Sequence, residues 1–407
     1  MCKALGLEVE YIEGYGKIDD KVPTSSNHAW NAVKIDNSYY LVDVAWGSGK
    51  CNGDTFQKSY TDYYFCPKPE CFIREHLPLD NKWQLLPKII TFQQFSDMAY
   101  LTEDFYKNGF LAISPDNHDI DINGKTKIYL SYNESQENFN LFIKLFYFEN
   151  NKLNEIKNSY LFYKEKGIIE IDIIANYEKS YMLIMYGGPS NLESYPPISY
   201  MFLNNLKVST SPIYYPFEYS LGMNGKLIEP LNGNLTQGTF VDFKIKSNSF
   251  DNIFIIIDDY FEREFEKLDG GIFYGESVYI FGKEVIITTY ERGVGHHLLY
   301  RYTTVKNPNM EKEPSFPENS IELPPHVLYS PIIDTLKKGN SYFFKIKCKS
   351  ATEMFVFDGE NMHDLTKNDD HTFSKQITID KTATQVVIAG YLSNSEDTTI
   401  FYIYKTS

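Results

Sequence analysis

The sequence has no long hydrophobic run and no excess of positive charge. No stretch of its 407 residues approaches the roughly 18 consecutive apolar residues that a membrane-spanning helix needs, so we expect no membrane span. Lys and Arg total 39 against 54 Asp and Glu, which gives a net charge of −15, and no basic patch interrupts this acidic background. We therefore expect no binding to nucleic acid or to anionic membrane surfaces.

Cysteine is also scarce. The five cysteines are Cys2, Cys51, Cys66, Cys71 and Cys348, and no two of them form a Cys-x-x-Cys pair. Cys66 and Cys71 are close enough in sequence to pair, but only under oxidation. Because the N-terminus also carries no apolar leader, we expect neither a disulfide scaffold nor a zinc site, and we expect a reducing, cytoplasmic location.

Three other runs contain residue types that can bind metal ions, but their spacing does not match a known metal site. The run 119–124 resembles the opening of a calcium loop, but Leu130 stands at the twelfth position, where a bidentate glutamate is required. We interpret this run as a hairpin turn. His296 and His297, and the polar run 368–371, lack convergent ligands, so we expect no metal and no other cofactor.

Aromatic residues are plentiful, with 33 Tyr and 29 Phe, and they favour half-buried sheet faces. After residue 95 the chain consists of short β-like runs separated by Gly, Asn, Asp and Pro, without a long helical period. Examples are 127–130, 142–147, 253–257, 284–289 and 385–389. This pattern predicts a mostly β protein built from β-sandwiches.

An internal repeat divides this β region. Leu227, Pro230, Leu235, Gly238 and the run 243–246 recur at a constant offset of 101. The matching positions are Leu328, Pro331, Leu336, Gly339 and 344–347, and Pro216 and Pro317 keep the same offset. A weaker copy starts near Gly109. We therefore predict three sandwich repeats, at 96–212, 213–312 and 313–407, and we expect the last two to fold without the region before them.

The segment 28–47 carries the candidate chemistry. Its alternating residues predict a β-hairpin around an Asn37-Ser38 turn, with His28 on one strand and Asp43 at the end of the next. A small stagger or bulge would let the two side chains meet on one face. In a Cys-His-Asp site the histidine takes the thiol proton and the acid orients the ring. On spacing alone, the commoner interpretation of His28 is a polar residue that is satisfied within a core strand.

The residues around this pair carry a family resemblance. His-Ala-Trp-Asn-Ala-Val at 28–33 and Tyr-Leu-Val-Asp-Val-Ala-Trp-Gly-Ser-Gly at 40–49 resemble the transglutaminase-like superfamily in its kyphoscoliosis peptidase and hillarin branch. Tyr-Tyr-Phe at 63–65, Phe72-Ile73, His-Leu-Pro at 76–78 and Trp-Gln-Leu-Leu at 83–86 extend this resemblance. It covers about residues 1–95 and implies a papain-like α+β head in which His28 is the general base and Asp43 its orienting acid. Ig-like repeats after such a head also resemble this branch.

The same resemblance predicts that the nucleophilic cysteine is absent. In the family that cysteine opens a helix whose later part resembles residues 1–7, so we expect this chain to carry only a partial, truncated head. Cys2 matches a packing position about eleven residues further along, roughly 16 Å away on a helix. That distance is too long for proton transfer to His28.

Two functions remain open. The first is a non-enzymatic adaptor or pseudoenzyme that binds protein partners, and the resemblance implies a cytoskeletal setting. The second is a fragment of an active cysteine peptidase or protein acyl transferase, which acts on a protein substrate. The chain as written favours the first, because covalent catalysis is lost without the nucleophile, whatever the base does.

Overall fold

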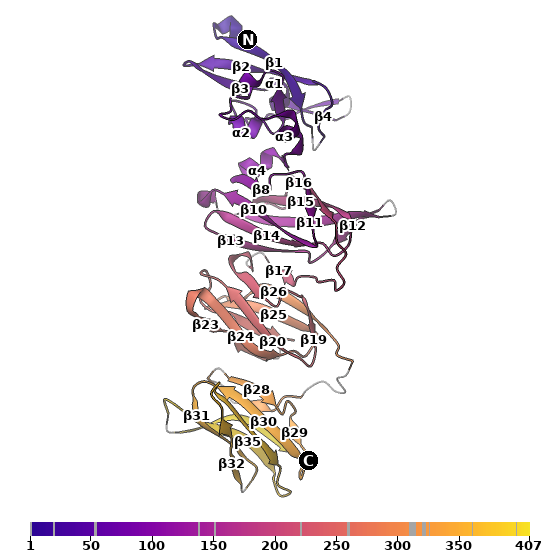
Figure 1. The fold of residues 1–407 in the computed structure, drawn as a ribbon. Coiled ribbons are helices and arrows are strands. Elements are labelled where there is room, and N and C mark those ends of the chain that lie inside the picture. The colour runs from indigo at the N-terminus through magenta and orange to yellow at the C-terminus, as the bar shows by residue number, and fades with distance from the viewer. Residues whose placement is uncertain are drawn as a thin grey trace. The chain divides into compact units, whose positions relative to one another are not determined.

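The structure is a computed structural model, shown as a ribbon in Figure 1. It describes residues 2–18, 21–52, 55–136, 139–149, 152–219, 222–258, 261–308, 315–319, 323–324, 326–359, 361–395 and 397–407. The chain divides into two compact units, Met1–Pro212 and Ile213–Ser407, and each is described by itself. Strands dominate both units, so the prediction of a mostly β protein is confirmed.

The head contains one antiparallel four-stranded sheet in the order β3-β2-β1-β6. Its strands are β1 (Val9–Gly16), β2 (His28–Ile35), β3 (Ser38–Val42) and β6 (His76–Pro78). A separate hairpin joins β4 (Gly49–Asn52) and β5 (Thr55–Lys58). Short helices complete the head: η1 (Cys2–Leu5), α1 (Val44–Ser48), α2 (Pro69–Phe72), η2 (Asn81–Gln84) and α3 (Phe92–Asp97).

The β2–β3 hairpin turns one residue earlier than predicted. Ile35 pairs with Ser38, so the two turn residues are Asp36 and Asn37, with φ of 47° and 68°. Positive φ at both central positions is typical of the type I′ turn that joins twisted strands. Asp and Asn accept this left-handed conformation more readily than serine does, and for this reason the predicted Asn37-Ser38 turn was wrong.

Among the described residues of the head, buried apolar side chains gather in two clusters. One joins the sheet to α2 through Ile12, Trp30, Ala32, Leu41 and Phe72. The other contains Ile73, Leu77 and Phe95. Phe95 belongs to α3, whose capping box is formed by Thr91 and Gln94. The buried Lys17 Nζ donates to the carbonyls of Phe95 (3.0 Å) and Met98 (3.4 Å), so it satisfies acceptors at the end of α3.

The first sandwich has a four-stranded sheet, β13-β14-β10-β8, and a six-stranded sheet, β12-β11-β15-β16-β7 with β9 paired to β16. The elements are β7 (Tyr100–Leu101), α4 (Glu103–Lys107), β8 (Phe110–Ser114), β9 (Asp119–Ile122), β10 (Lys125–Tyr132), η3 (Glu134–Gln136), β11 (Phe139–Glu149), β12 (Lys152–Ile156), β13 (Tyr160–Glu165), β14 (Ile168–Ile174), β15 (Ser180–Pro189) and β16 (Pro197–Asn205). The predicted strands 127–130 and 142–147 lie in β10 and β11.

The run 119–124 is not the hairpin turn that we predicted. Residues 119–122 form β9, which pairs in parallel with β16, whereas β10 belongs to the other sheet. Gly124, with φ of 82°, turns the chain from one sheet to the other. Four residues of alternating Asp and Ile therefore form a strand whose partner is distant in sequence.

The second unit contains two further sandwiches with the same arrangement of a four-stranded and a six-stranded sheet. The first comprises β17 (Phe217–Glu218), η4 (Gly222–Asn224), β18 (Lys226–Glu229), β19 (Asn234–Thr236), β20 (Phe240–Lys246), β21 (Phe254–Ile257), β22 (Phe261–Glu264), β23 (Glu266–Leu268), η5 (Asp269–Gly271), β24 (Ile272–Tyr279), β25 (Glu284–Glu291) and β26 (Gly295–Val305). The second comprises β27 (Glu318–Asn319), β28 (His326–Ser330), β29 (Thr335–Leu336), β30 (Ser341–Cys348), β31 (Ala351–Phe357), β32 (Met362–Asp364), β33 (Thr366–Lys367), β34 (Thr372–Thr378), β35 (Gln385–Leu392) and β36 (Thr398–Thr406).

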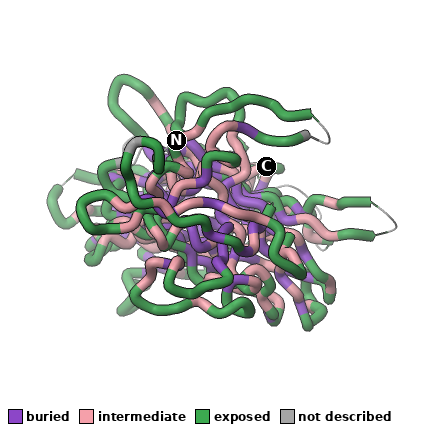
Figure 2. Tube along the Cα trace, turned by 90° about the horizontal axis from the view of Figure 1, so that it is seen from above, coloured by how far each residue is buried: buried purple, intermediate pink, exposed green. Residues whose placement is uncertain are grey.

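Repeated residues occupy equivalent places in these two sandwiches. Gly238 and Gly339 both adopt positive φ, 78° and 76°. The hydroxyl of a buried tyrosine ties the last long strand to a proline carbonyl in each: Tyr302 to Pro230 (3.0 Å), and Tyr404 to the carbonyl of Pro331 (3.1 Å). In Figure 2 buried stretches alternate with exposed ones along the chain, and the projecting loops are exposed.

The domain boundaries stay predictions. The boundary between residues 312 and 313 lies in the stretch 309–314, outside the described residues. The boundary between residues 95 and 96 lies inside α3, which packs Phe95 into the head. The boundary between residues 212 and 213 coincides with the division between the two compact units.

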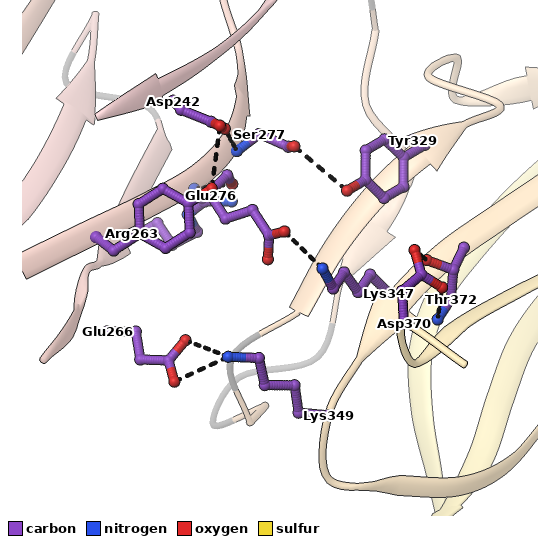
Figure 3. Close-up of polar contacts among 11 residues, drawn as sticks. Asp242, Arg263, Glu266, Glu276, Ser277, Tyr329, Lys347, Lys349, Asp370 and Thr372 are labelled. Atoms are coloured by element: carbon purple, nitrogen blue, oxygen red, sulfur yellow. Dashed lines mark hydrogen bonds and ion pairs between the residues drawn. The ribbon is translucent and has the colours of Figure 1, made fainter. Parts of the chain in front are cut away.

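Charged side chains join the two sandwiches of the second unit (Figure 3). Lys347 of β30 forms an ion pair with Glu276 of β24 at 2.5 Å, and Lys349 pairs with Glu266 at 2.7 Å. Within the first of these sandwiches, Arg263 donates to the main-chain carbonyl of Glu276 at 2.6 Å and so supports the residue that binds Lys347. The side chains of Lys347 and Glu276 are only 15% and 26% exposed, so water screens this pair less than an ordinary surface pair.

Reversing one charge of this pair should destabilise the second unit. We expect Glu276→Lys to lower the free energy of unfolding by about 1 kcal/mol, and the double variant with Lys347→Glu to recover most of that loss. Urea denaturation of the full chain, followed by tyrosine fluorescence, gives the double-mutant cycle. Glu318→Lys is the matched control, because Glu318 and Lys405 are both largely exposed and 3.8 Å apart. Equal losses at positions 276 and 318 would contradict a coupled interface.

Candidate functional site

Asp43 is fixed at the junction of a strand and a helix. It follows β3 directly and is the N-cap of α1, where its Oδ1 accepts a hydrogen bond from the Trp46 amide at 3.0 Å. Its own amide donates to the Tyr64 carbonyl at 3.0 Å. Aspartate is a preferred N-cap because its carboxylate satisfies free amides of the first turn. The carboxylate is therefore held from its Oδ1 side, and Oδ2 remains for other partners.

His28 is one of these partners. Asn31 pairs with Val42 across β2 and β3, and continuing this register places Trp30 opposite Asp43 and His28 diagonal to it, on the same face as Trp30. The sequence hypothesis that His28 and Asp43 meet therefore needs no bulge. His28 Nε2 lies 2.5 Å from Asp43 Oδ2. Because an ionised carboxylate only accepts, Nε2 is the donor, and Nδ1 is the nitrogen left to accept a proton.

A second histidine, which the sequence did not reveal, also contacts Asp43. His76 Nε2 lies 2.9 Å from the same Oδ2 atom, and the His76 side chain is fully buried. His76 begins β6, which pairs with β1 through Gly16. It was among the residues that carry the family resemblance, but a three-residue strand has no periodicity that would show where its side chain points.

Opposing effects set the charge of this cluster. Burial raises the pKa of the Asp43 carboxyl, but hydrogen bonds from His28, His76 and the Trp46 amide outweigh it and hold that pKa well below its usual range. Burial lowers the pKa of His76 to about 4, despite the opposing hydrogen bond to Asp43. At neutral pH the cluster therefore contains an ionised Asp43 and a neutral His76.

Aromatic rings hold both imidazoles. Trp46 stacks on His28 with ring centroids 4.7 Å apart, and Phe72 stacks on His76 at 3.9 Å. Trp30 lies edge-on to His76 at 5.1 Å. The stacked rings restrict rotation of the imidazoles, so each keeps its Nε2 atom directed at Asp43.

The distances between the ligand atoms of His28, Asp43 and His76 fit hydrogen bonds better than coordination of a metal ion. His28, Asp43 and His76 offer three ligand atoms within 4.8 Å of one another. Ligands about 2.1 Å from a tetrahedral zinc ion stand roughly 3.4 Å apart. The two N···O distances here, 2.5 and 2.9 Å, are hydrogen-bond distances, so the ligand atoms would have to separate before an ion fitted between them.

The structure describes the side chains of four of the five cysteines, all of them free thiols. Cys51 is exposed in β4, and Cys348 is buried in the last sandwich. Cys66 and Cys71 are free thiols, and burial raises the pKa of each. The side chain of Cys2 lies outside the described part of the chain. No cysteine sulfur among the described residues forms a hydrogen bond with His28.

Glycines of β1 make room for the cluster. A Cβ atom at Gly16 would lie 2.8 Å from His28 Cβ, and one at Gly14 would lie 2.3 Å from the Leu77 carbonyl oxygen. Real Cβ contacts are essentially never this short. Gly16 therefore allows β2 and β6 to bring His28 and His76 together from either side of β1. Nothing in the residues around Gly16 predicted this role.

We expect Gly16→Ala to displace His28 and to lower the free energy of unfolding of the head by about 1–3 kcal/mol, the usual cost of overpacking. All three tryptophans, Trp30, Trp46 and Trp83, lie in the head, so urea denaturation of the full chain followed by tryptophan fluorescence measures this directly. Gly47→Ala is the control, because its nearest neighbours are 3.5 Å away. A loss at position 16 no larger than that at position 47 would contradict the steric argument.

Comparison with known proteins shows which proteins this chain is similar to. Residues 92–216 match the family model described as "KY-like, immunoglobulin-like domain". Mouse kyphoscoliosis peptidase is 34% identical over 136 residues, which cover 31% of this chain and 21% of that protein. The chain is a kyphoscoliosis-peptidase-like multidomain protein. This confirms the resemblance to the kyphoscoliosis peptidase and hillarin branch.

Other relatives are similar over comparable lengths. Drosophila melanogaster hillarin is 28% identical over 127 residues, covering 27% of this chain and 16% of hillarin. Schizosaccharomyces pombe cytokinesis protein 3 is 37% identical over 91 residues, covering 21% of this chain and 10% of that protein. The matched part thus spans about a fifth or less of these relatives.

Solved structures are more distant. The titin I-band fragment I67–I69 is 9% identical, with a TM-score of 0.15, over 71% of this chain and 94% of the fragment. The Ig-like assignment of the kyphoscoliosis-peptidase-like chain therefore comes from its own paired sheets and from the family model. Among the described residues, no helix is long and apolar enough to cross a membrane.

Proposed function

We propose that this chain is a protein-binding adaptor whose head is a catalytically incomplete transglutaminase-like domain. In this head His28 and Asp43 are the base and acid of a Cys-His-Asp arrangement. The observation that carries the proposal is the contrast between an ordered base–acid pair and thiols that are ill suited to it. A nucleophilic cysteine needs a lowered pKa, whereas burial raises the pKa of both Cys66 and Cys71.

A cytoskeletal protein is the partner class that we propose. Support comes from the relatives, one of which is named a cytokinesis protein. Tandem Ig-like sandwiches present several exposed strand edges and loops, which suit contacts with extended protein partners. We also propose a cytoplasmic, cytoskeleton-associated location on the same grounds.

The test has two parts. The purified 407-residue chain is incubated with casein, with and without a fluorescent amine, and we expect neither cleavage nor amine incorporation that iodoacetamide abolishes. Thiol-dependent turnover that is lost in Cys51→Ala, Cys66→Ala or Cys71→Ala would overturn the incomplete-domain proposal. Co-sedimentation with actin filaments and with microtubules tests the partner class, and failure to pellet with either would contradict it.

A second function rests on a different observation. The 2.5 Å contact between His28 and Asp43 has the geometry of a working base–acid pair, which favours a fragment of a cysteine peptidase or acyl transferase. A thiol beside His28 Nδ1 would give up its proton to that nitrogen. The thiolate would then attack a substrate amide carbonyl, the C–N bond would break, and the amine would leave with the proton held by His28. Water or a second amine would then cleave the resulting thioester and release the thiol.

A longer version of the protein distinguishes the two proposals. If sequence that precedes residue 1 in the gene supplies a thiol, the extended protein should show casein turnover that Asp43→Asn removes. An extended protein that remains inactive with intact His28 and Asp43 would exclude the enzyme and retain the adaptor.

A further inference from the structure

We propose that His76 is a positioning residue of this site: it donates a hydrogen bond to Asp43 Oδ2 and holds that carboxylate ionised and aimed at His28. This inference rests on the proposed roles of His28 as base and Asp43 as acid. Nothing in the sequence pattern assigned a role to His76, and its hydrogen bond within the site is to Asp43. It therefore acts through Asp43.

The direction of the hydrogen bond follows from charge. Burial lowers the pKa of His76 to about 4, so the ring is neutral at pH 7 and carries one N–H. Asp43 is ionised and can only accept. The atom that faces Asp43 Oδ2 at 2.9 Å is His76 Nε2, so the single proton of this ring must lie there.

The position of the ring follows from packing. His76 is 1% exposed, and its ring is stacked on Phe72 with an interplanar angle of 13°. On another side Trp46 lies with its ring centroid 4.4 Å away. Backbone pairing of His76 with Gly16 fixes the start of β6. The orientation of the His76 ring is therefore restricted by packing, independently of its hydrogen bond to Asp43.

The carboxylate consequently has three fixed donors. The Trp46 amide binds Oδ1, and His28 and His76 bind Oδ2. The ionisable groups with the largest effects on His76 are Asp43 and His28. Among the described residues, the ion-pair partners of Asp43 are the two histidines, and none is a lysine or an arginine. A buried carboxylate without a cationic partner depends on hydrogen bonds to stay ionised. Removing His76 takes away one of them and leaves the burial penalty in place.

Two variants, His76→Gln and His76→Met, separate the effect of the N–H donor of His76 from the effect of its aromatic ring. Gln places an amide N–H near the position of His Nε2, whereas Met has a similar length and no donor. Both variants lose the aromatic stacking equally. Carbon-13 NMR of the Asp43 carboxyl, in the full chain with labelled aspartate, gives its titration, and the signal is identified by its absence in Asp43→Asn.

We expect Asp43 in wild-type protein and in His76→Gln to stay ionised down to the lowest pH at which the head is folded. In His76→Met its titration should move up by about one pH unit or more. Equal titrations in His76→Gln and His76→Met would overturn the proposal, since only the ring would then matter. If His76→Met does not fold, as tryptophan fluorescence would show, His76→Phe replaces it and keeps the stacking.

This readout does not depend on turnover. If Asp43 titrates as expected and no thiol activity is found in any form of the protein, His76 positions an acid in a head that only binds partners. If thiol activity is found but Asp43 titrates identically in all variants, the enzyme function stands and the role of His76 is refuted.

Discussion

Replacing Asp43 by asparagine is expected to lower the free energy of unfolding of the head by about 3 kcal/mol. Asp43 is 2% exposed and accepts from three donors, on His28, His76 and the Trp46 amide. Asparagine keeps one acceptor oxygen and adds an amide N–H that faces two imidazole donors. At least one donor is then left unpaired in the interior, or an imidazole must change its tautomer.

Tryptophan fluorescence during urea denaturation measures this loss, because all three tryptophans lie in the head. Asp36→Asn is the matched control. Asp36 is exposed in the β2–β3 turn, where asparagine adopts the required positive φ equally well, so its effect should stay within about 0.5 kcal/mol. If the two variants unfold at the same urea concentration, Asp43 does not organise the cluster.

Residue pattern and family resemblance together predicted the His28–Asp43 pair, because both residues lie on one short hairpin. Contacts within a hairpin follow from local spacing, and a one-residue error in the turn did not prevent the pairing. His76 could not be found in this way. It reaches Asp43 from a strand that pairs with β1 instead of β2 or β3, and 33 residues separate the two positions in the sequence.

The β region shows the same limit. Runs such as 142–147 and 284–289 predicted strands correctly, since they are rich in the β-branched and aromatic residues that favour strands. The run 119–122 was misread because four residues give no period and its parallel partner, β16, is distant in sequence. The role of Gly16 was missed for a related reason. The residues around a glycine do not indicate that neighbouring strands approach each other closely there.

The second large effect concerns the pH dependence of the head. Burial lowers the pKa of His76 to about 4 from 6.5. Between these values the unfolded chain binds a proton that the native state does not, so the contribution of His76 is complete above pH 6.5 and is lost as the pH falls towards 4. At about 1.4 kcal/mol for each pKa unit, about 2 kcal/mol should be lost between pH 6.5 and pH 5.

Glu75, the neighbouring residue, has the opposite effect. Burial raises the pKa of its carboxyl to about 7 from 4.5, and Tyr64 donates to Glu75 Oε2 at 3.1 Å. Between these values the native state binds a proton that the unfolded chain does not. The contribution of Glu75 is therefore complete below pH 4.5 and is lost as the pH rises through 7. In the wild-type head the two contributions oppose each other over the range in which they overlap, from about pH 4.5 to 6.5.

The variant Glu75→Gln separates the pH-dependent contribution of His76 from that of Glu75. Glutamine can still accept from Tyr64 but does not titrate, so this variant should be less stable at pH 5 than at pH 6.5 by about 2 kcal/mol, whereas the wild-type head changes little. Urea denaturation of the full chain at these two pH values, followed by tryptophan fluorescence, compares them. Glu70→Gln, at an exposed position within α2, should behave as wild type. A Glu75→Gln head with the wild-type pH dependence would mean that Glu75 is already ionised in the native state, and the opposing-residue explanation would fail.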